Sequence, residues 1–346
     1  MAEVRVDHPI VEQAQRIADE LLFPEADEVD GTGVVPSTHW ERLAEDGFYG
    51  LAIGPGVAEL GLAGVVEVLE ILAGGCLATT FTWLQHNGAA ISLNGSRNEA
   101  LKNRYLDDLA TGRIRAGVAL AGALPTPPRL WATRVADGYL LNGGAPFVSG
   151  WGIVDLVHVS ARERSAEDAG GEVVSGLIDA RAVEGLNVQH LDLIAAQATN
   201  TVALQFDDYV LPAERVTSTT ALPDFLSSQA FGSRLNGSLA CGIARRAIRL
   251  LSEHGHDGVS STLNAQLDRA RADLDDSMSD TATLLEARAT ASDLALRAAG
   301  TLVAATGSAA ILAGRTPGRL LREAGFTLVA ASRPEMRTAL LARITR

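Results

Sequence analysis

The 346-residue sequence has few aromatic residues, only two cysteines and, in Lys102, a single lysine. Cys76 and Cys241 stand too far apart for a zinc motif or a disulfide framework, so we expect buried free thiols and no metal site. The net charge is −13 and no run of lysine and arginine occurs, which disfavours nucleic acid and other polyanions as partners.

Long apolar stretches are also missing. No apolar run reaches the roughly 18 residues that span a bilayer, and residues 1–13 lack the charged and apolar regions of a signal peptide. We therefore expect a soluble, cytoplasmic protein. The 47% of hydrophobic residues are enough for a large core with more than one packed layer.

The first third of the chain has the hydrophobic spacing of helices, with apolar residues three and four positions apart. The segment at 60–72 is apolar nearly all round, which predicts a buried helix. Gly112 is a stop signal for the last of these helices. Helices are expected at 10–22, 40–48, 60–72, 79–93 and 99–109.

The middle of the chain has short β-rich runs separated by turn residues, a pattern typical of a small barrel or sandwich. Strands are expected at 118–121, 139–148, 156–160, 173–178, 186–191 and 201–210. Asn142, Gly143 and Gly144 can adopt the positive φ angles that a tight turn needs, which predicts a hairpin between Tyr139–Leu141 and Phe147–Gly150.

Helical spacing returns after the strands. Apolar or small residues recur three and four apart from Leu263 to Leu285, which predicts one long helix on a bundle seam. The expected fold class is therefore a multidomain α+β protein. It has an N-terminal helical bundle at 1–115, a middle β-barrel or sandwich at 116–222 and a C-terminal four-helix-type bundle at 223–346.

Four separated segments of the chain carry a resemblance to one family. Asp137–Asp155 is similar to its gyvlnG-K-W-it-g segment, and Ala203–Pro212 is similar to its l-Fddv-vP segment. Leu43–Leu51 resembles la-e-Gl-gl, and Tyr105–Gly112 resembles yL--la-G. Taken in their order along the chain, these segments resemble the acyl-CoA dehydrogenase family. The resemblance implies FAD as cofactor, an acyl-CoA thioester as substrate, α,β-desaturation as the reaction and an oligomer built on the C-terminal helices.

The resemblance also implies site residues. The family's flavin-stacking tryptophan falls on Phe147 and its threonine near flavin N5 falls on Ser149, with Val148 between them; both changes keep an aromatic face and a hydroxyl donor. Leu120 is a further expected flavin contact. Trp83 and His86 fall near the acyl pocket. Histidine titrates near neutral pH, so His86 is either an acid–base group or a structural residue.

The carboxylate that removes the α-proton in this family is missing. Its usual position, nine residues after the arginine of the family's RDa motif, falls on Ala331 when counted from Arg322. A minority of the family places it on an earlier helix, at the position of Gly232. Neither residue can accept a proton, so no catalytic base is assigned. Glu335 is either a helix cap beside Ser332 or a substitute base.

The expected cofactor contacts are also fewer than in the family. The loop at 120–128 lacks the family's acid and Gly-Ser-Asp residues, and the segment at 252–257 has acids where the family has an arginine for the FAD diphosphate. We therefore expect FAD to be weakly or partly bound by this chain. Arg245, Arg246 and Arg249 either contact the CoA phosphates or the acids of a partner chain, or form a solvated helix face.

Three functions follow from this pattern. The first is desaturation of an acyl-CoA with a base supplied by a partner chain. The second is a non-catalytic subunit of a heteromeric acyl-CoA dehydrogenase. The third is a flavin-dependent monooxygenase-type reaction, in which no α-proton is removed. All three imply a homo- or hetero-oligomer with chains of this type.

Overall fold

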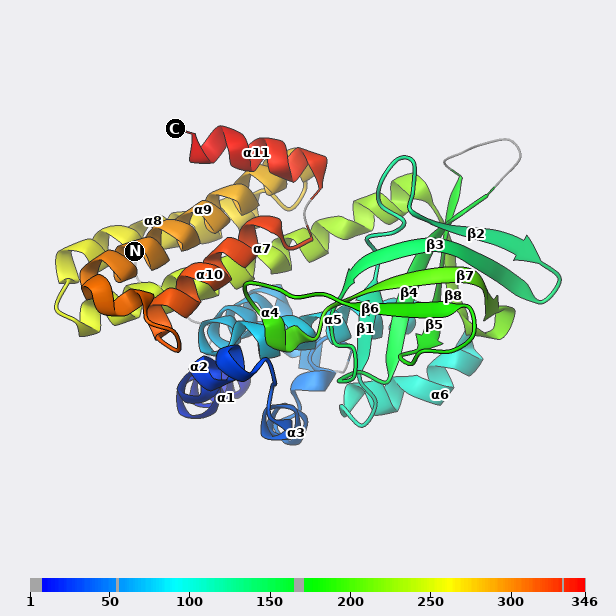
Figure 1. Ribbon diagram of the computed structural model, residues 1–346, viewed down its shortest axis with the longest axis horizontal. Coiled ribbons are helices and arrows are strands. Elements are labelled where there is room, and N and C mark those ends of the chain that lie inside the picture. The colour runs from blue at the N-terminus through cyan, green and yellow to red at the C-terminus, as the bar shows by residue number, and fades with distance from the viewer. Residues whose placement is uncertain (1–7, 54–55, 165–170, 332, 346) are drawn as a thin grey trace.

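The computed structural model describes residues 8–53, 56–164, 171–331 and 333–345. Helices form the beginning and the end of the chain, and a mixed β-sheet is formed by the segment between them (Figure 1). The predicted order of helices, strands and helices is confirmed. The last helix before the sheet ends at Ala110, the first strand begins at Ala116, and the next long helix begins at Leu222.

α5 lies between the sheet and the C-terminal helices in Figure 1. Most of its side chains are buried, because it packs against α4, α6, α7 and β1. The predicted first helix is interrupted by a π-helical turn, η1. The elements are α1 (Pro9–Ile17), η1 (Ala18–Leu22), α2 (Phe23–Thr32), α3 (Ser37–Glu45), η2 (Phe48–Gly50), α4 (Gly56–Gly75), α5 (Leu77–Asn94) and α6 (Glu99–Ala110).

The strands form an eight-stranded sheet in the order β6-β7-β3-β2-β4-β5-β8, with β1 parallel to β4. The pairs are antiparallel except for β1–β4 and β2–β4. Two of the strands, β2 and β8, were not predicted; β8 is rich in threonine and has little apolar alternation. The strands are β1 (Ala116–Ala119), β2 (Leu130–Val135), β3 (Gly138–Val148), β4 (Leu156–Glu163), β5 (Glu172–Asp179), β6 (Leu186–His190), β7 (Val202–Pro212) and β8 (Val216–Ala221).

The hairpin predicted at Asn142–Gly144 is wrong. β3 runs straight through these residues, with a register shift against β7 between Leu141 and Gly143, and the hairpin turn lies instead between β2 and β3, where Val135 pairs with Gly138. Gly143 has a φ of 115°, and a Cβ there would collide with the carbonyl oxygen of Arg129. The glycine is therefore needed for a close backbone approach at a bulge.

The C-terminal helices pack side by side, with α9 against α7, α8, α10 and α11. The single helix predicted from Leu263 to Leu285 is wrong, because the chain turns between Asp276 and Thr281 and the side chain of Asp280 caps the new helix. The elements are α7 (Leu222–Glu253), α8 (Asp257–Asp276), α9 (Thr281–Thr306), η5 (Gly307–Ile311), α10 (Thr316–Val329) and α11 (Pro334–Ile344).

The segment Thr281–Ile311 is long and apolar enough to cross a membrane by length and composition, and 33% of its most apolar window is buried within the chain. The core helix of a bundle passes the same test. Because α9 packs against four neighbouring helices, we interpret it as such a helix. The segment has no uninterrupted apolar run, so its sequence gives no clear sign of a membrane-spanning helix.

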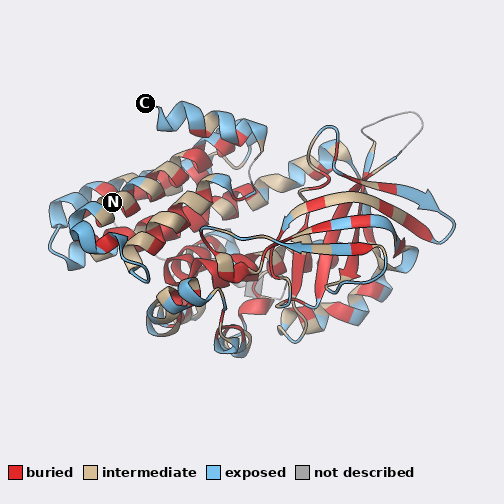
Figure 2. Cartoon of the chain, viewed as in Figure 1, coloured by how far each residue is buried: buried red, intermediate tan, exposed pale blue. Residues whose placement is uncertain are grey.

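The largest hydrophobic core joins the two helical parts, and a second core lies within the sheet. Buried residues form a continuous band where the helices meet in Figure 2. α4 and α7 cross so closely that a Cβ on Gly242 would collide with the carbonyl oxygen of Glu70. The helices at the two ends of the chain therefore fold as one packed unit.

Candidate functional site

The end of β3 carries an exposed aromatic ring, Phe147, and a buried hydroxyl group, Ser149. Phe147 has a left-handed φ of 56° and its residue is 67% exposed. Val148 is fully buried, and Ser149 is only 6% exposed. The ring of Phe147 is therefore open to a ligand, whereas Ser149 lies against the interior.

The hydroxyl of Ser149 belongs to a buried chain of three hydroxyl groups. Its Oγ lies 2.7 Å from Oγ1 of Thr201, which lies 2.7 Å from Oγ1 of Thr199. Thr199 donates its only proton to the carbonyl oxygen of Ala196 at 2.8 Å. Thr201 must therefore donate to Thr199, and Ser149 must donate to Thr201. Any further partner of the Ser149 hydroxyl has to be a hydrogen-bond donor.

Backbone strain surrounds this chain of hydroxyls. Ala196 and Asn200, at the two ends of the 3₁₀ turn η3 (Gln197–Thr199), have left-handed φ angles of 55° and 46°. Gly150 donates its N–H to the carbonyl oxygen of Thr199 at 2.7 Å, which ties the end of β3 to this turn. Strained non-glycine residues persist where surrounding contacts impose them, and they are common at functional sites.

The loop after β1 lies beside β3. Leu120 packs with Ala123, Val173 and Phe225, so it links the loop to α7. Its expected flavin contact stays a prediction. The loop ends at Arg129, whose N–H donates to Gly122 and whose carbonyl oxygen accepts the N–H of Gly144.

Trp83 and His86 are both buried on α5. Trp83 donates its ring N–H to the carbonyl oxygen of Phe48 at 3.3 Å. His86 accepts the N–H of Ala116 at Nδ1, so its Nε2–H donates to the carbonyl oxygen of Leu109. Burial lowers the pKa of His86 to about 4. Both ring nitrogens are used within the chain, so a substrate could meet only ring carbons, and the pocket role of the two residues stays a prediction.

Two polar side chains that no sequence motif indicates lie on the same face of α5 as Trp83. Thr80 and Asn87 are seven residues apart and buried, and Thr80 Oγ1 and Asn87 Oδ1 have no partner among the described residues. Leaving such an atom unpaired costs about 1–3 kcal/mol. Thr80 and Asn87 therefore each keep one polar atom without a partner inside a mostly apolar helix. Their signal in the sequence, polar residues in an apolar helix, is common to structural caps and bends as well.

The two expected base positions are open and carry no acid. A Cβ on Gly232 in α7 would meet no atom within 4 Å. Ala331 is exposed with a φ of 47°, and its carbonyl oxygen accepts from Arg288 at 3.4 Å. Burial, with repulsion from Arg333, lowers the pKa of Arg288 to about 10. The surroundings of Ala331 are therefore positively charged.

The nearby acids have other roles. Glu323 is buried and pairs with Arg319 at 3.0 Å. Glu335 is exposed in the first turn of α11. The helix cap predicted for Glu335 depends partly on Ser332, which lies outside the described residues.

Of the arginines on α7, Arg246 does not belong to a solvated face, whereas Arg249 is exposed. Arg246 is buried, and it donates to Asp19 at 2.6 Å and to the carbonyl oxygen of Gly74 at 2.7 Å. Arg249 also pairs with Asp19. The sequence alone could not show that η1 brings this acid to α7, 227 positions away.

The cysteines match the prediction of free thiols, since both are buried and unpaired, and burial raises the pKa of each thiol. In the part of the chain that the structure describes, no group of three His, Cys, Asp or Glu side chains could hold a metal ion.

The helix–sheet–helix arrangement is the fold of acyl-CoA dehydrogenases. Butyryl-CoA dehydrogenase from Megasphaera elsdenii superposes with a TM-score of 0.84 at 19% identity, covering 100% of both chains. A glutaryl-coenzyme A dehydrogenase complex superposes with a TM-score of 0.84 at 16% identity, covering 99% of this chain and 96% of the other.

Sequence comparison agrees with the fold. The model of the acyl-CoA dehydrogenase N-terminal domain matches residues 7–113. Acryloyl-CoA reductase (NADH) of Anaerotignum propionicum is 25% identical over 71% of this chain and 65% of its own length. Mitochondrial isobutyryl-CoA dehydrogenase of Dictyostelium discoideum is 26% identical over 78% of this chain and 66% of its own length. The chain is therefore similar to the acyl-CoA dehydrogenase family in its N-terminal domain and in its fold, and its matches span just under two thirds of these relatives.

Proposed function

We propose that this chain binds FAD and an acyl-CoA, and that it takes part in α,β-desaturation only when another chain supplies the base. The observation that carries the proposal is that both base positions, Ala331 and Gly232, are open but acid-free. An intact fold with an exposed aromatic ring beside an ordered hydroxyl supports ligand binding. The missing acid supports dependence on a partner.

The residues at the end of β3 fit a flavin. Phe147 offers an exposed aromatic face for stacking, and Ser149 offers an oxygen whose position is fixed by Thr201. The solved relatives include an FAD complex of PigA, with a TM-score of 0.80 and 20% identity. Bound FAD would supply the hydride acceptor for the reaction. The chain's own contribution is to orient the ring and to offer Thr80 and Asn87 to the acyl ligand.

The charge around Ala331 argues against a base at that position. A carboxylate there would lie beside Arg288, which would lower its pKa and weaken it as a proton acceptor. Gly232 has no such neighbour among its contacts. Of the two positions, Gly232 is the one where a carboxylate could act as a base, whether it is introduced in this chain or brought there by a partner.

The test introduces the missing carboxylate at Gly232. Purified protein with FAD is mixed with butyryl-CoA without oxygen, and the flavin absorbance is followed. We expect flavin binding without bleaching in the natural chain, and bleaching in Gly232→Glu. Gly258→Glu, at another open helical glycine, is the matched control and should behave like the natural chain.

Three results would contradict the proposal. They are an absence of flavin binding, rapid bleaching by the natural chain alone, and bleaching in both glutamate variants. Product hydroxylation coupled to oxygen consumption would favour the monooxygenase-type reaction in its place.

A further inference from the structure

Arg288 in α9 is a buried cation whose hydrogen-bond partners are uncharged. The residue is 2% exposed, and its guanidinium donates to the carbonyl oxygens of Ala330 and Ala331. Among the described residues no Asp or Glu side chain pairs with it, and its Nε has no partner. Buried charges are normally paired, because an isolated charge is costly to remove from water. Arg288 therefore favours an anion close to it.

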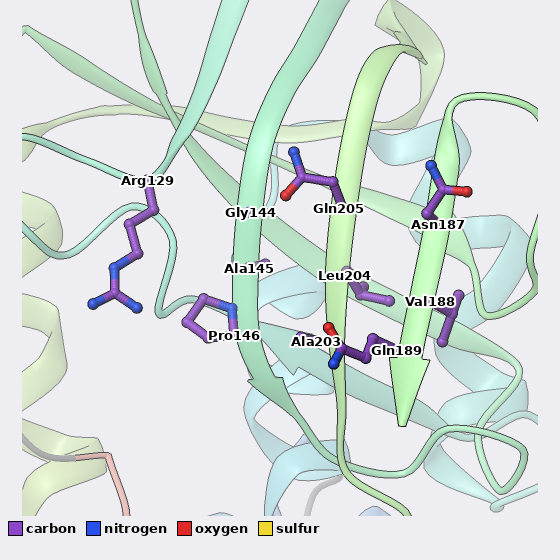
Figure 3. A pocket seen from close by; sticks show the side chains of 10 residues that line it. All are labelled: Arg129, Gly144, Ala145, Pro146, Asn187, Val188, Gln189, Ala203, Leu204 and Gln205. Atoms are coloured by element: carbon purple, nitrogen blue, oxygen red, sulfur yellow. The ribbon is translucent and has the colours of Figure 1, made fainter. Parts of the chain in front are cut away.

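Other arginines of the chain do not share this situation. Three of the buried ones pair with acids: Arg234 with Asp275, Arg246 with Asp19, and Arg319 with Asp27 and Glu323. Arg129 lies at a hollow across β3, β7 and β6, where water can solvate its exposed side chain (Figure 3). Arg288 has neither an acid nor this exposure.

Further positive charge gathers near Arg288, where α10 ends and α11 begins. Burial, together with repulsion from Arg333 at the N-cap of α11, lowers the pKa of Arg288 to about 10. Burial also lowers the pKa of Arg333, and the exposed Glu335 opposes this effect. No side chain of the described residues caps α11, and a helix N-terminus carries partial positive charge. Two arginines and a helix N-terminus therefore outweigh one exposed acid.

This surplus of positive charge suits a carboxylate that binds and does not accept a proton. Nearby arginines keep a carboxyl group ionised by lowering its pKa, and a guanidinium holds it through charge-assisted hydrogen bonds. The carbonyl oxygen of Ala331 accepts from Arg288 at 3.4 Å, and Arg333 follows two residues later. The resemblance implies that Ala331 lies beside the substrate carbon that loses its proton. A ligand carboxylate here would therefore belong to the acyl group.

We propose that Arg288 and Arg333 recognise a carboxylate on the acyl group, so that the preferred substrates are thioesters of dicarboxylic acids. The inference rests on the proposed function, which brings an acyl-CoA to this site, and it deepens that function by naming the substrate class. The chain discriminates between an acyl group that ends in a carboxylate and one of equal length that ends in a methyl group.

The test compares glutaryl-CoA with pentanoyl-CoA in isothermal titration calorimetry of the full chain. Their acyl chains are equally long and their CoA is identical, so a difference reports the carboxylate alone. The natural chain should bind glutaryl-CoA about tenfold more tightly, the gain expected for one charge-assisted contact. Arg333→Gln should remove this difference and leave the affinity for pentanoyl-CoA unchanged. Arg97→Gln, at an exposed arginine elsewhere, is the matched control and should keep the difference.

Arg288→Gln provides a second variant. It should weaken glutaryl-CoA binding in the same direction, and its affinity for pentanoyl-CoA reports whether the site is still folded. Equal affinity of the natural chain for the two thioesters would overturn the inference and leave the proposed function standing. A preference for glutaryl-CoA that both Arg288→Gln and Arg333→Gln retain would also overturn it.

Free glutarate is a third probe, with sodium chloride at equal ionic strength as its control. If neither thioester binds, but glutarate binds in a manner that Arg333→Gln abolishes, the anion site stands and the proposed function fails. If neither the thioesters nor glutarate bind, or if chloride displaces glutarate as well as glutarate itself does, the inference fails.

Discussion

At the scale of single residues, the Ser149 hydroxyl is the most constrained group of the candidate site. The resemblance implied a hydroxyl donor at this position. The structure commits its proton to Thr201, because the chain of hydroxyls ends at the carbonyl oxygen of Ala196. An oxygen that only accepts favours the reduced flavin, whose N5 carries a hydrogen, over the oxidised flavin, whose N5 is an acceptor.

Thr199→Val should reverse this preference, because it removes the group that fixes the direction of the chain. Ser149 could then donate, which stabilises oxidised flavin by about 1 kcal/mol. The two-electron midpoint potential should fall by about 20 mV, measured by spectroelectrochemistry. Thr262→Val, at an exposed helix position, is the control. An unchanged or raised potential in Thr199→Val would refute the assigned direction.

The sequence could locate some of these residues and not others. Phe147 and Ser149 lie within one short, recognisable segment, so local pattern was enough to select them. Thr199 and Thr201 lie some fifty positions further on, and only the folding of η3 against the end of β3 brings them there. Arg129 follows a proline-rich loop without a regular period, so no pattern placed it beside β3.

At the scale of helices and strands, a buried ion network joins α2 to α10. Arg319 donates to Asp27 at 2.7 Å and pairs with Glu323 at 3.0 Å, and its guanidinium lies over the ring of Phe23. Burial raises the pKa of the Glu323 carboxyl, and Arg319 opposes that rise. Removing only one partner of the Arg319–Glu323 ion pair should therefore lower the free energy of unfolding strongly, because the other charge stays buried.

Arg319→Met should lower the free energy of unfolding by about 3–5 kcal/mol, because it leaves Glu323 and Asp27 without their cation. Urea unfolding measures the change. Arg322→Met, one turn further on and partly exposed, should cost about 1 kcal/mol or less. A double variant, Arg319→Met with Glu323→Leu, should recover part of the loss. Equal losses of unfolding free energy in Arg319→Met and Arg322→Met would contradict the special role of the buried Arg319 network.

Most elements could be predicted from hydrophobic spacing, and the errors have local causes. Asn142–Gly144 has the composition of a turn, but Gly143 is there to admit the Arg129 carbonyl. The spacing from Leu263 to Leu285 continues across a turn, because both helices face the same seam. β8 is hidden by its threonines, since it is mostly exposed, has no alternation of apolar residues and is held by its pairing with β5.

At the scale of the whole molecule, His86 and His158, two of the three buried histidines among the described residues, should make stability depend on pH. Burial lowers the pKa of His86 and of His158 to about 4, from an ordinary value of 6.5. The unfolded chain therefore binds more protons than the folded chain between pH 6.5 and pH 4, and stability falls as the pH falls through that window.

At pH 5, each histidine should cost on the order of 2 kcal/mol of stability relative to pH 8. Chemical unfolding at a series of pH values measures the slope. His86→Gln and His158→Gln should each flatten it, whatever they do to stability at neutral pH. His190→Gln, at an exposed position, should keep the natural slope. A natural chain with no loss of stability between pH 7 and pH 5 would refute this reading.

The loop between β6 and β7 touches all three parts of the fold. Arg322 of α10 donates to the carbonyl oxygen of Ile194 at 3.0 Å, and η3 packs against both α2 and α5. Such a brace resists hinge motion between the sheet and the helices. The protein would then discriminate among ligands by a fixed shape, without closing over them. Substitutions that change the preferred ligand size should therefore lie among the side chains that contact the ligand, and not in the loops that connect the sheet to the helices.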